Sequence, residues 1–138
     1  AFATPESVWD YMSKNLFYTG DPWGGAMDYY TNPLTLQAFI NYGQQKRLNI
    51  DCDDYALYAY KALWAIPGCR PQVVTLVDST LKWSHVITVF TYNGKFGAID
   101  TTGLRYLPNL SPGTIMREWG RLYPNSKYIR AVNTDYPF

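Results

Sequence analysis

The sequence lacks a long apolar run and a charge excess of either sign. No stretch of eighteen or more apolar residues occurs, so the sequence offers no candidate membrane-spanning helix. Twelve basic residues oppose eleven acidic ones and are scattered along the chain, which argues against a nucleic-acid partner. The opening segment AFATPESVWD lacks the basic start and apolar middle of a secretory signal. We therefore expect a soluble protein, and its cellular location stays open.

Cysteine and histidine are also scarce. The only cysteines are Cys52 and Cys69, too few for a disulfide framework and without C-x-x-C spacing. A zinc site is disfavoured, because these cysteines and the single histidine, His85, show no recognisable ligand spacing. A chain of 138 residues can bury a core without disulfides or a structural metal. We therefore predict one domain over residues 1–138.

Aromatic residues, in contrast, are abundant, with 13 Tyr, 5 Trp and 6 Phe. Aromatic side chains mainly supply core volume, so we interpret most of them as core or groove lining rather than as a carbohydrate site. Several lie in the segment 17–30, which is also rich in Gly, Asp and Pro and therefore predicts an irregular surface loop. This loop is a candidate wall of a groove.

The hydrophobic pattern changes along the chain. Helical spacing predicts one helix over about 5–17, a short helix between Asn32 and Gly43, and a third that begins at Cys52 and ends before Pro67. After that point the period becomes two, which predicts antiparallel strands in the segments PQVVTLVD, HVITVF, KFGAID and KYIRAV. Helices packed on an antiparallel sheet make an α+β domain.

Three carboxylates surround the cysteine at the start of the third helix. Asp51 is a good N-cap, and Asp54 then completes a variant of the capping box. Cys52 takes the first helical position, where the helix dipole lowers a thiol pKa, while Asp51 and Asp53 act in the opposite direction. A nucleophilic cysteine at this place needs a positive partner, and imidazolium is the usual one.

The histidine can be placed from a predicted turn. Asn93-Gly94 between alternating runs is a strong signal for a two-residue hairpin loop. In the register that this loop sets, His85 lies opposite Thr102 and is a diagonal neighbour of Asp100. Diagonal neighbours have Cα atoms roughly 7–8 Å apart, within reach of a hydrogen bond between an imidazole and a carboxylate. A bulge in either strand would break this prediction.

Cys52, His85 and Asp100 therefore form a candidate catalytic group of nucleophile, base and orienting carboxylate. Each residue also has a structural interpretation. A lone cysteine is more often a small buried hydrophobe, a lone histidine is more often structural, and Asp100 could cap the end of its strand. Two independent features, helix capping and hairpin register, bring the three together.

The cysteine and hairpin motifs resemble those of the transglutaminase-like superfamily, and DCDDYA is similar to the bacterial transglutaminase-like cysteine proteinases. The resemblance covers about residues 5–105, with Ile50 in place of a glycine that commonly precedes the Asp-Cys pair. The segments that carry it are NLFYTGD, DYYTNPLTLQAF, DCDDYALYAYKAL, HVITVF, NGK and AIDTTG.

The resemblance implies a papain-like fold and thiol acyl transfer. Cys52 would attack an amide carbonyl of a protein or peptide substrate, His85 would carry the proton, and Asp100 would fix the imidazole tautomer. The N–H of Cys52 would be one oxyanion donor. With water as acceptor the product is that of a protease, and with a lysine amine the reaction is cross-linking; we favour the protease.

No cofactor is required by this chemistry. Some related periplasmic proteinases bind calcium through acids that correspond to Asp51 and Asp53, and oxygen ligands suit that ion. Helix capping explains the same acids, and we favour it over calcium. The sequence also leaves open a cell-wall amidase of the NlpC/P60 type and a non-catalytic binding module on the same fold. It does not indicate an oligomeric state.

Overall fold

The computed structural model describes most of the chain, in four ranges: residues 2–17, 33–43, 50–79 and 84–135. Within these ranges the helices are α1 (Pro5–Asn15), α2 (Pro33–Asn41), α3 (Cys52–Trp64) and α4 (Pro112–Leu122). The strands are β1 (Arg70–Asp78), β2 (Ser84–Tyr92), β3 (Lys95–Asp100), β4 (Gly103–Leu107) and β5 (Tyr128–Thr134). Apart from Phe17, the predicted aromatic loop at 17–30 lies outside the described residues.

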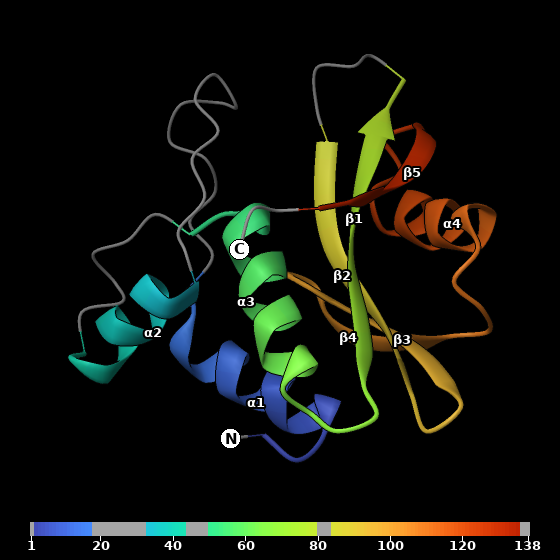
Figure 1. Cartoon of the computed structure of the whole chain (residues 1–138). Helices are drawn as coiled ribbons and strands as arrows, with labels where there is room; N and C mark the ends of the chain where they lie inside the picture. The colour runs from blue at the N-terminus through green and yellow to red at the C-terminus, as the bar shows by residue number, and fades with distance from the viewer. Residues whose placement is uncertain (1, 18–32, 44–49, 80–83, 136–138) are drawn as a thin grey trace.

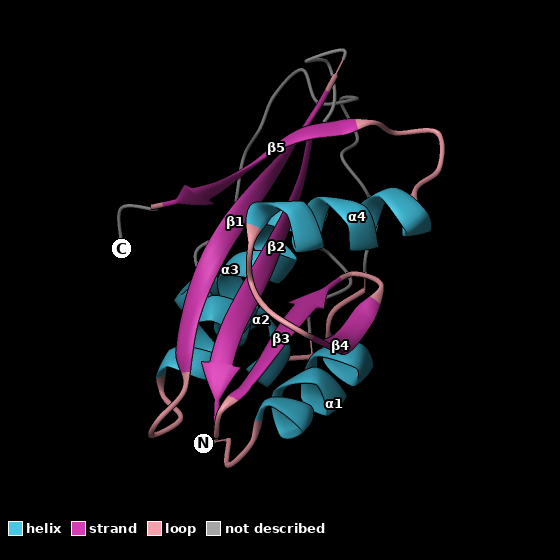
Figure 2. Cartoon of the chain, turned by 90° about the vertical axis from the view of Figure 1, so that its right-hand side faces the viewer, coloured by secondary structure: helices cyan, strands magenta, loops and turns pink. Residues whose placement is uncertain are grey.

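The strands form one antiparallel sheet in the order β4-β3-β2-β1-β5. Helices α1, α2 and α3 lie on one side of it and α4 on the other (Figures 1 and 2). The result is a three-layer arrangement. Its α+β class is the one that the change of hydrophobic period predicted, whereas the third layer, α4, was not predicted. None of the helices in the described ranges is long and apolar enough to cross a membrane.

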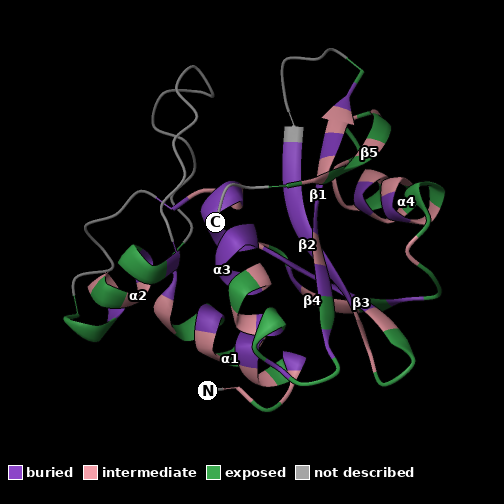
Figure 3. Cartoon of the chain, in the orientation of Figure 1, coloured by how far each residue is buried: buried purple, intermediate pink, exposed green. Residues whose placement is uncertain are grey.

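Each face of the sheet has its own core because strand side chains alternate between faces. On the α3 side, Phe90 of β2 and Ile99 of β3 pack with residues of α1, α2 and α3. On the α4 side, Ile87 and Val89 of β2 pack against Trp119. Burial is accordingly concentrated on β1, β2, β3 and α3, whereas β5 has no buried residue (Figure 3).

Helix α3 is more deeply buried than a single apolar stripe predicts. Every residue over 53–59 is buried, because α1, α2 and the sheet all pack around this part of the helix. Helix α3 ends at Trp64, before Pro67, as predicted. Helix α1 is shorter than predicted: it ends at Asn15 rather than near residue 17, because Leu16 adopts an extended conformation.

The β2–β3 hairpin has the predicted turn and register. Asn93 and Gly94 have φ values of 51° and 74°, the left-handed conformation that a two-residue turn of this kind requires. The pairing begins at Tyr92 with Lys95 and continues to Thr88 with Ile99. His85, three residues before Thr88, therefore lies beyond the paired part of the hairpin.

The last third of the chain differs most from the sequence prediction. Helix α4 is absent from the elements predicted above, and Pro112 occupies its first turn, where a missing N–H costs nothing. Ser111 caps this helix by accepting a hydrogen bond from the N–H of Thr114 at 3.2 Å. Strand β4 was also missing from the prediction, and only β5 was anticipated.

Candidate active site

The N-terminus of α3 carries the capping box expected from the sequence. The Oδ1 atom of Asp51 accepts from the N–H groups of Asp53 at 3.1 Å and Asp54 at 3.2 Å. In return, the Oδ2 atom of Asp54 accepts from the N–H of Asp51 at 3.1 Å. These bonds satisfy backbone donors that have no partner within the helix, and they fix Cys52 in the first turn.

The thiol of Cys52 points at the interface between α3 and β2. It donates to Oδ1 of Asp53 at 3.7 Å and accepts from the backbone N–H of Val86, the residue that follows His85. Burial, together with the charges of Asp53 and Asp51, raises the pKa of Cys52 to about 12. At neutral pH the thiol in this structure is therefore protonated.

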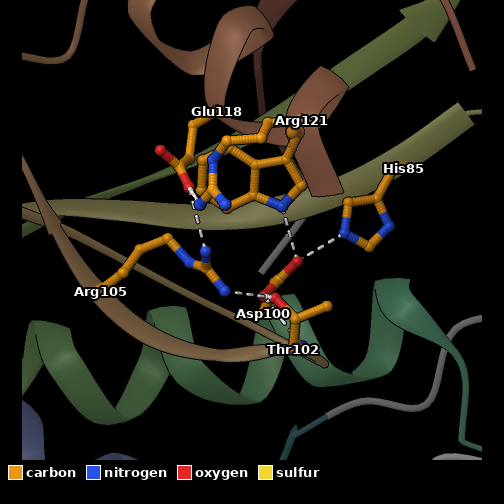
Figure 4. Close-up of polar contacts among 7 residues, drawn as sticks. His85, Asp100, Thr102, Arg105, Glu118 and Arg121 are labelled. Atoms are coloured by element: carbon orange, nitrogen blue, oxygen red, sulfur yellow. Dashed lines mark hydrogen bonds and ion pairs between the residues drawn. The ribbon is translucent and has the colours of Figure 1, made fainter. Parts of the chain in front are cut away.

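His85 and Asp100 form a buried pair. The Nε2 atom of His85 lies 2.7 Å from Oδ2 of Asp100 (Figure 4), and the two residues are only 4% and 1% exposed. The imidazole ring packs against Tyr123, with ring centroids 5.3 Å apart. The diagonal contact that the hairpin register predicted is therefore present, although the catalytic role of the two residues stays a prediction.

Asp100 accepts further hydrogen bonds. Its Oδ2 atom accepts from Nε1 of Trp119 at 2.7 Å, and its Oδ1 atom accepts from both the N–H, at 2.9 Å, and the hydroxyl of Thr102. Burial raises the pKa of Asp100, but the hydrogen bonds from His85, Thr102 and Trp119 prevail and hold it below its ordinary value. Asp100 is therefore ionised at neutral pH.

The sequence prediction missed the surroundings of Asp100. Trp119 lies on α4, and the signal that could have found that helix is Ser111-Pro112 followed by Ile115 and Trp119 at helical spacing. Nothing in the sequence pattern tied that helix to the aspartate, because the contact depends on how α4 crosses the sheet.

The structure thus brings His85 and Asp100 together and places Cys52 beside the next residue of β2. An imidazole whose Nε2–H is held by an ionised carboxylate has Nδ1 as its basic nitrogen. A base of this kind beside a thiol can promote attack of sulfur on a carbonyl carbon.

The residues described do not form a complete metal site. No group of three or more His, Cys, Asp or Glu side chains within them is arranged to hold an ion. Oδ1 of Asp51 is already engaged by two backbone N–H groups, and Oδ1 of Asp53 by the thiol. Asp51 and Asp53 stay calcium candidates only, and their observed contacts are those of helix capping and of the cysteine.

Comparison with known proteins places the fold. No protein-family model matches the chain, and no curated protein sequence does. The solved structures that resemble it include Legionella pneumophila LapG, with a TM-score of 0.52, and the same protein treated with EGTA, with a TM-score of 0.53. Each is 21% identical in sequence and covers 95% of this chain.

This chain spans 64% of the first LapG structure and 62% of the second, so it corresponds to just under two thirds of that protein. The arrangement of helices on an antiparallel sheet matches the papain-like, transglutaminase-like fold of LapG. The expected fold class is confirmed.

Proposed function

We propose that the chain is a cysteine-dependent amide hydrolase of the transglutaminase-like superfamily that acts on a protein or peptide substrate. The observation that carries the proposal is the buried hydrogen bond between His85 and Asp100, with Cys52 at a helix N-terminus beside Val86. The similarity to LapG, a transglutaminase-like cysteine protease, supports the same kind of activity, although at 21% identity it speaks for the fold first.

In the proposed reaction, Nδ1 of His85 takes the thiol proton as the sulfur of Cys52 attacks the amide carbonyl. The N–H of Cys52 stabilises the developing oxyanion, the C–N bond breaks, and the imidazolium returns the proton to the leaving amine. Water, deprotonated by the same imidazole, then hydrolyses the thioester and regenerates the thiol. Asp100 keeps the imidazole in the Nε2–H tautomer throughout.

Two rival activities would use the same residues. If a lysine amine replaces water as acyl acceptor, the product is a cross-link; if the amide belongs to a cell wall, the enzyme is an amidase. A non-catalytic binding module is favoured by one observation, the raised pKa of Cys52, because a protonated and partly buried thiol is a poor nucleophile. The general-base step above does not require a thiolate in advance.

The first experiment separates a catalytic from a structural cysteine. A Cys69→Ala protein, in which Cys52 is the single thiol, is treated briefly with limiting iodoacetamide at pH 6, and the intact mass is followed with time. If the imidazole of His85 assists the thiol, Cys52 is labelled despite its raised pKa, and we expect the rate to fall at least about tenfold in the additional variant His85→Ala.

The control is Lys14→Ala on the exposed surface of α1, which should leave the rate unchanged. Equal and slow labelling with and without His85 would contradict the proposal and favour the binding module. Where labelling is fast, a screen of peptide amides with and without added lysine amines distinguishes hydrolysis from cross-linking.

A further inference from the structure

One oxygen of Asp100 is shared by two ring N–H groups. Nε2 of His85 and Nε1 of Trp119 each lie 2.7 Å from Oδ2. A carboxylate oxygen offers two lone pairs in its plane, and these two donors use both. Because Trp119 is fully buried, water does not compete for this position. The carboxylate therefore cannot turn about its bond to Cβ without breaking one of the two bonds.

The other oxygen of Asp100 is fully engaged as well. Oδ1 accepts from the N–H and the hydroxyl of Thr102, and that hydroxyl in turn accepts from Nη2 of Arg105 at 2.9 Å (Figure 4). A protonated carboxyl would have to give up at least one of these acceptor positions. The arrangement around Asp100 thus favours its charged form, in agreement with the lowered pKa.

The indole ring of Trp119 is itself held in place by Arg105. The guanidinium of Arg105 lies over the indole ring, 5.6 Å from its centroid, at a distance typical of a cation–π contact. Nη1 of the same side chain donates to Oε1 of Glu118 at 3.2 Å. Since Glu118 and Trp119 are neighbours on α4, the helix, the arginine and the threonine form one connected support for Asp100 (Figure 4).

We infer that Trp119 is a positioning residue: its indole N–H orients the Asp100 carboxylate and keeps it ionised, so that His85 is held as the Nε2–H tautomer with Nδ1 as the base. The catalytic meaning of this inference rests on the proposed function. Trp119 does not reach the substrate and acts only through Asp100. Helix α4, on the far side of the sheet from α3, thereby becomes part of the active-site architecture.

The test uses the fact that the chain has a single histidine, so its imidazole ¹⁵N signals need no assignment. The variant is Trp119→Phe, which keeps an aromatic ring and removes the N–H. The control is Trp9→Phe, a partly buried indole that packs against the core on the α3 side. We expect the wild type and the control to show the Nε2–H tautomer, and Trp119→Phe to show a mixture with the Nδ1–H tautomer.

In the same variant the Asp100 pKa, read from its carboxyl ¹³C signal, should rise. The His85-dependent alkylation of Cys52, and kcat on any peptide substrate found, should fall about tenfold to a hundredfold with KM unchanged, the size of a lost hydrogen bond to a charged group. If Trp119 had only a structural role, Trp119→Phe would alter folding but would leave the populations of the two His85 tautomers unchanged.

The outcomes separate the two proposals. A tautomer shift in a protein that has no hydrolase activity supports the positioning role and contradicts the proposed function. An unchanged tautomer and Asp100 pKa in Trp119→Phe overturn the positioning role, whatever the activity. If Trp119→Phe does not fold, the wild-type protein is titrated instead. The chemical shift of the indole N–H proton of Trp119 should then change as Asp100 is protonated. An indole signal that does not change during this titration overturns the inference.

Discussion

At the scale of single residues, the surroundings of Asp100 and of Cys52 shift the pKa values of these two groups in opposite directions. Asp100 is surrounded by donors that lower its pKa, whereas Cys52 is close to two carboxylates that raise the pKa of its thiol. Asp53 contributes both a charge and the oxygen that accepts the thiol proton in a hydrogen bond. The first turn of α3 therefore keeps the thiol of Cys52 protonated, and in the proposed reaction His85 must remove a proton that Asp53 helps to retain.

Asp53→Asn should make the thiol more acidic. After burial, the charge of Asp53 is the largest influence that raises the pKa of Cys52, so its removal lowers that pKa from its value of about 12. A fall of one unit gives roughly tenfold more thiolate at a given alkaline pH below the pKa. The measurement is the iodoacetamide rate against pH in the Cys69→Ala background.

Asp10→Asn is the matched control, because Asp10 is an exposed aspartate that pairs with Lys14 on α1. Its pH profile should coincide with that of the parent. A profile unchanged in Asp53→Asn would mean that the charge of Asp53 does not contribute to the raised pKa of Cys52.

At the scale of elements, the sequence predicted those parts whose structure depends on neighbouring residues. Helix α3 could be placed from Asp51 and the residues that follow it, and the β2–β3 hairpin from Asn93-Gly94, because capping and turn geometry are local. The contact between His85 and Asp100 was predicted by extending the hairpin register, and it is present although the pairing of β2 with β3 ends at Thr88 and Ile99.

What could not be predicted depends on how separate elements pack. Trp119 reaches Asp100 only because α4 crosses the face of the sheet opposite α3 (Figure 2). The thiol lies against the N–H of Val86 because of the angle at which α3 meets β2. The hydrophobic period of the sequence carries no information about that angle. Helix α4, which begins at Pro112, was not among the predicted elements.

The pairing of β2 with β3 depends on a glycine. A Cβ atom at Gly97 would overlap the ring of Phe90, its fully buried partner across the hairpin. Gly97→Ala should therefore lower the free energy of unfolding by about 1–3 kcal/mol, the usual cost of overpacking a core. Urea denaturation followed by far-UV circular dichroism measures this change.

Gly120→Ala provides the comparison within the same chain. A Cβ at Gly120 would meet no atom within 4 Å, and the residue lies inside α4, so alanine should stabilise the protein by about 0.5–1 kcal/mol. If the two substitutions changed stability equally, the contact with Phe90 would not be the cause.

At the scale of the whole molecule, one sheet separates two cores. The α3 side holds the larger cluster of buried residues, including Met12 and Leu63, and the α4 side holds Trp119. Both clusters include side chains of β2 and β3, so neither layer can lose its packing without exposing a face of the same sheet. A single domain is the expectation that follows.

We expect unfolding to be one cooperative transition. Tryptophan fluorescence and far-UV circular dichroism should give coincident urea curves, because Trp9 lies on the α3 side and Trp119 on the α4 side. The same coincidence is expected in Trp119→Phe at a lower midpoint. Two separate transitions, or curves that differ between the two probes, would instead mean that the layers unfold independently.

The tight β2–β3 hairpin also sets an order of events during synthesis. His85 and Asp100 are 15 residues apart and are joined by a turn of two residues, so their pair can close as soon as both strands are available, on the microsecond scale of hairpin formation. Cys52 is made earlier than both. At about 5–20 residues per second, roughly 2 to 10 s of translation separate Cys52 from Asp100. Every newly made chain therefore carries Cys52 for some seconds before His85 and Asp100 have both been added to it.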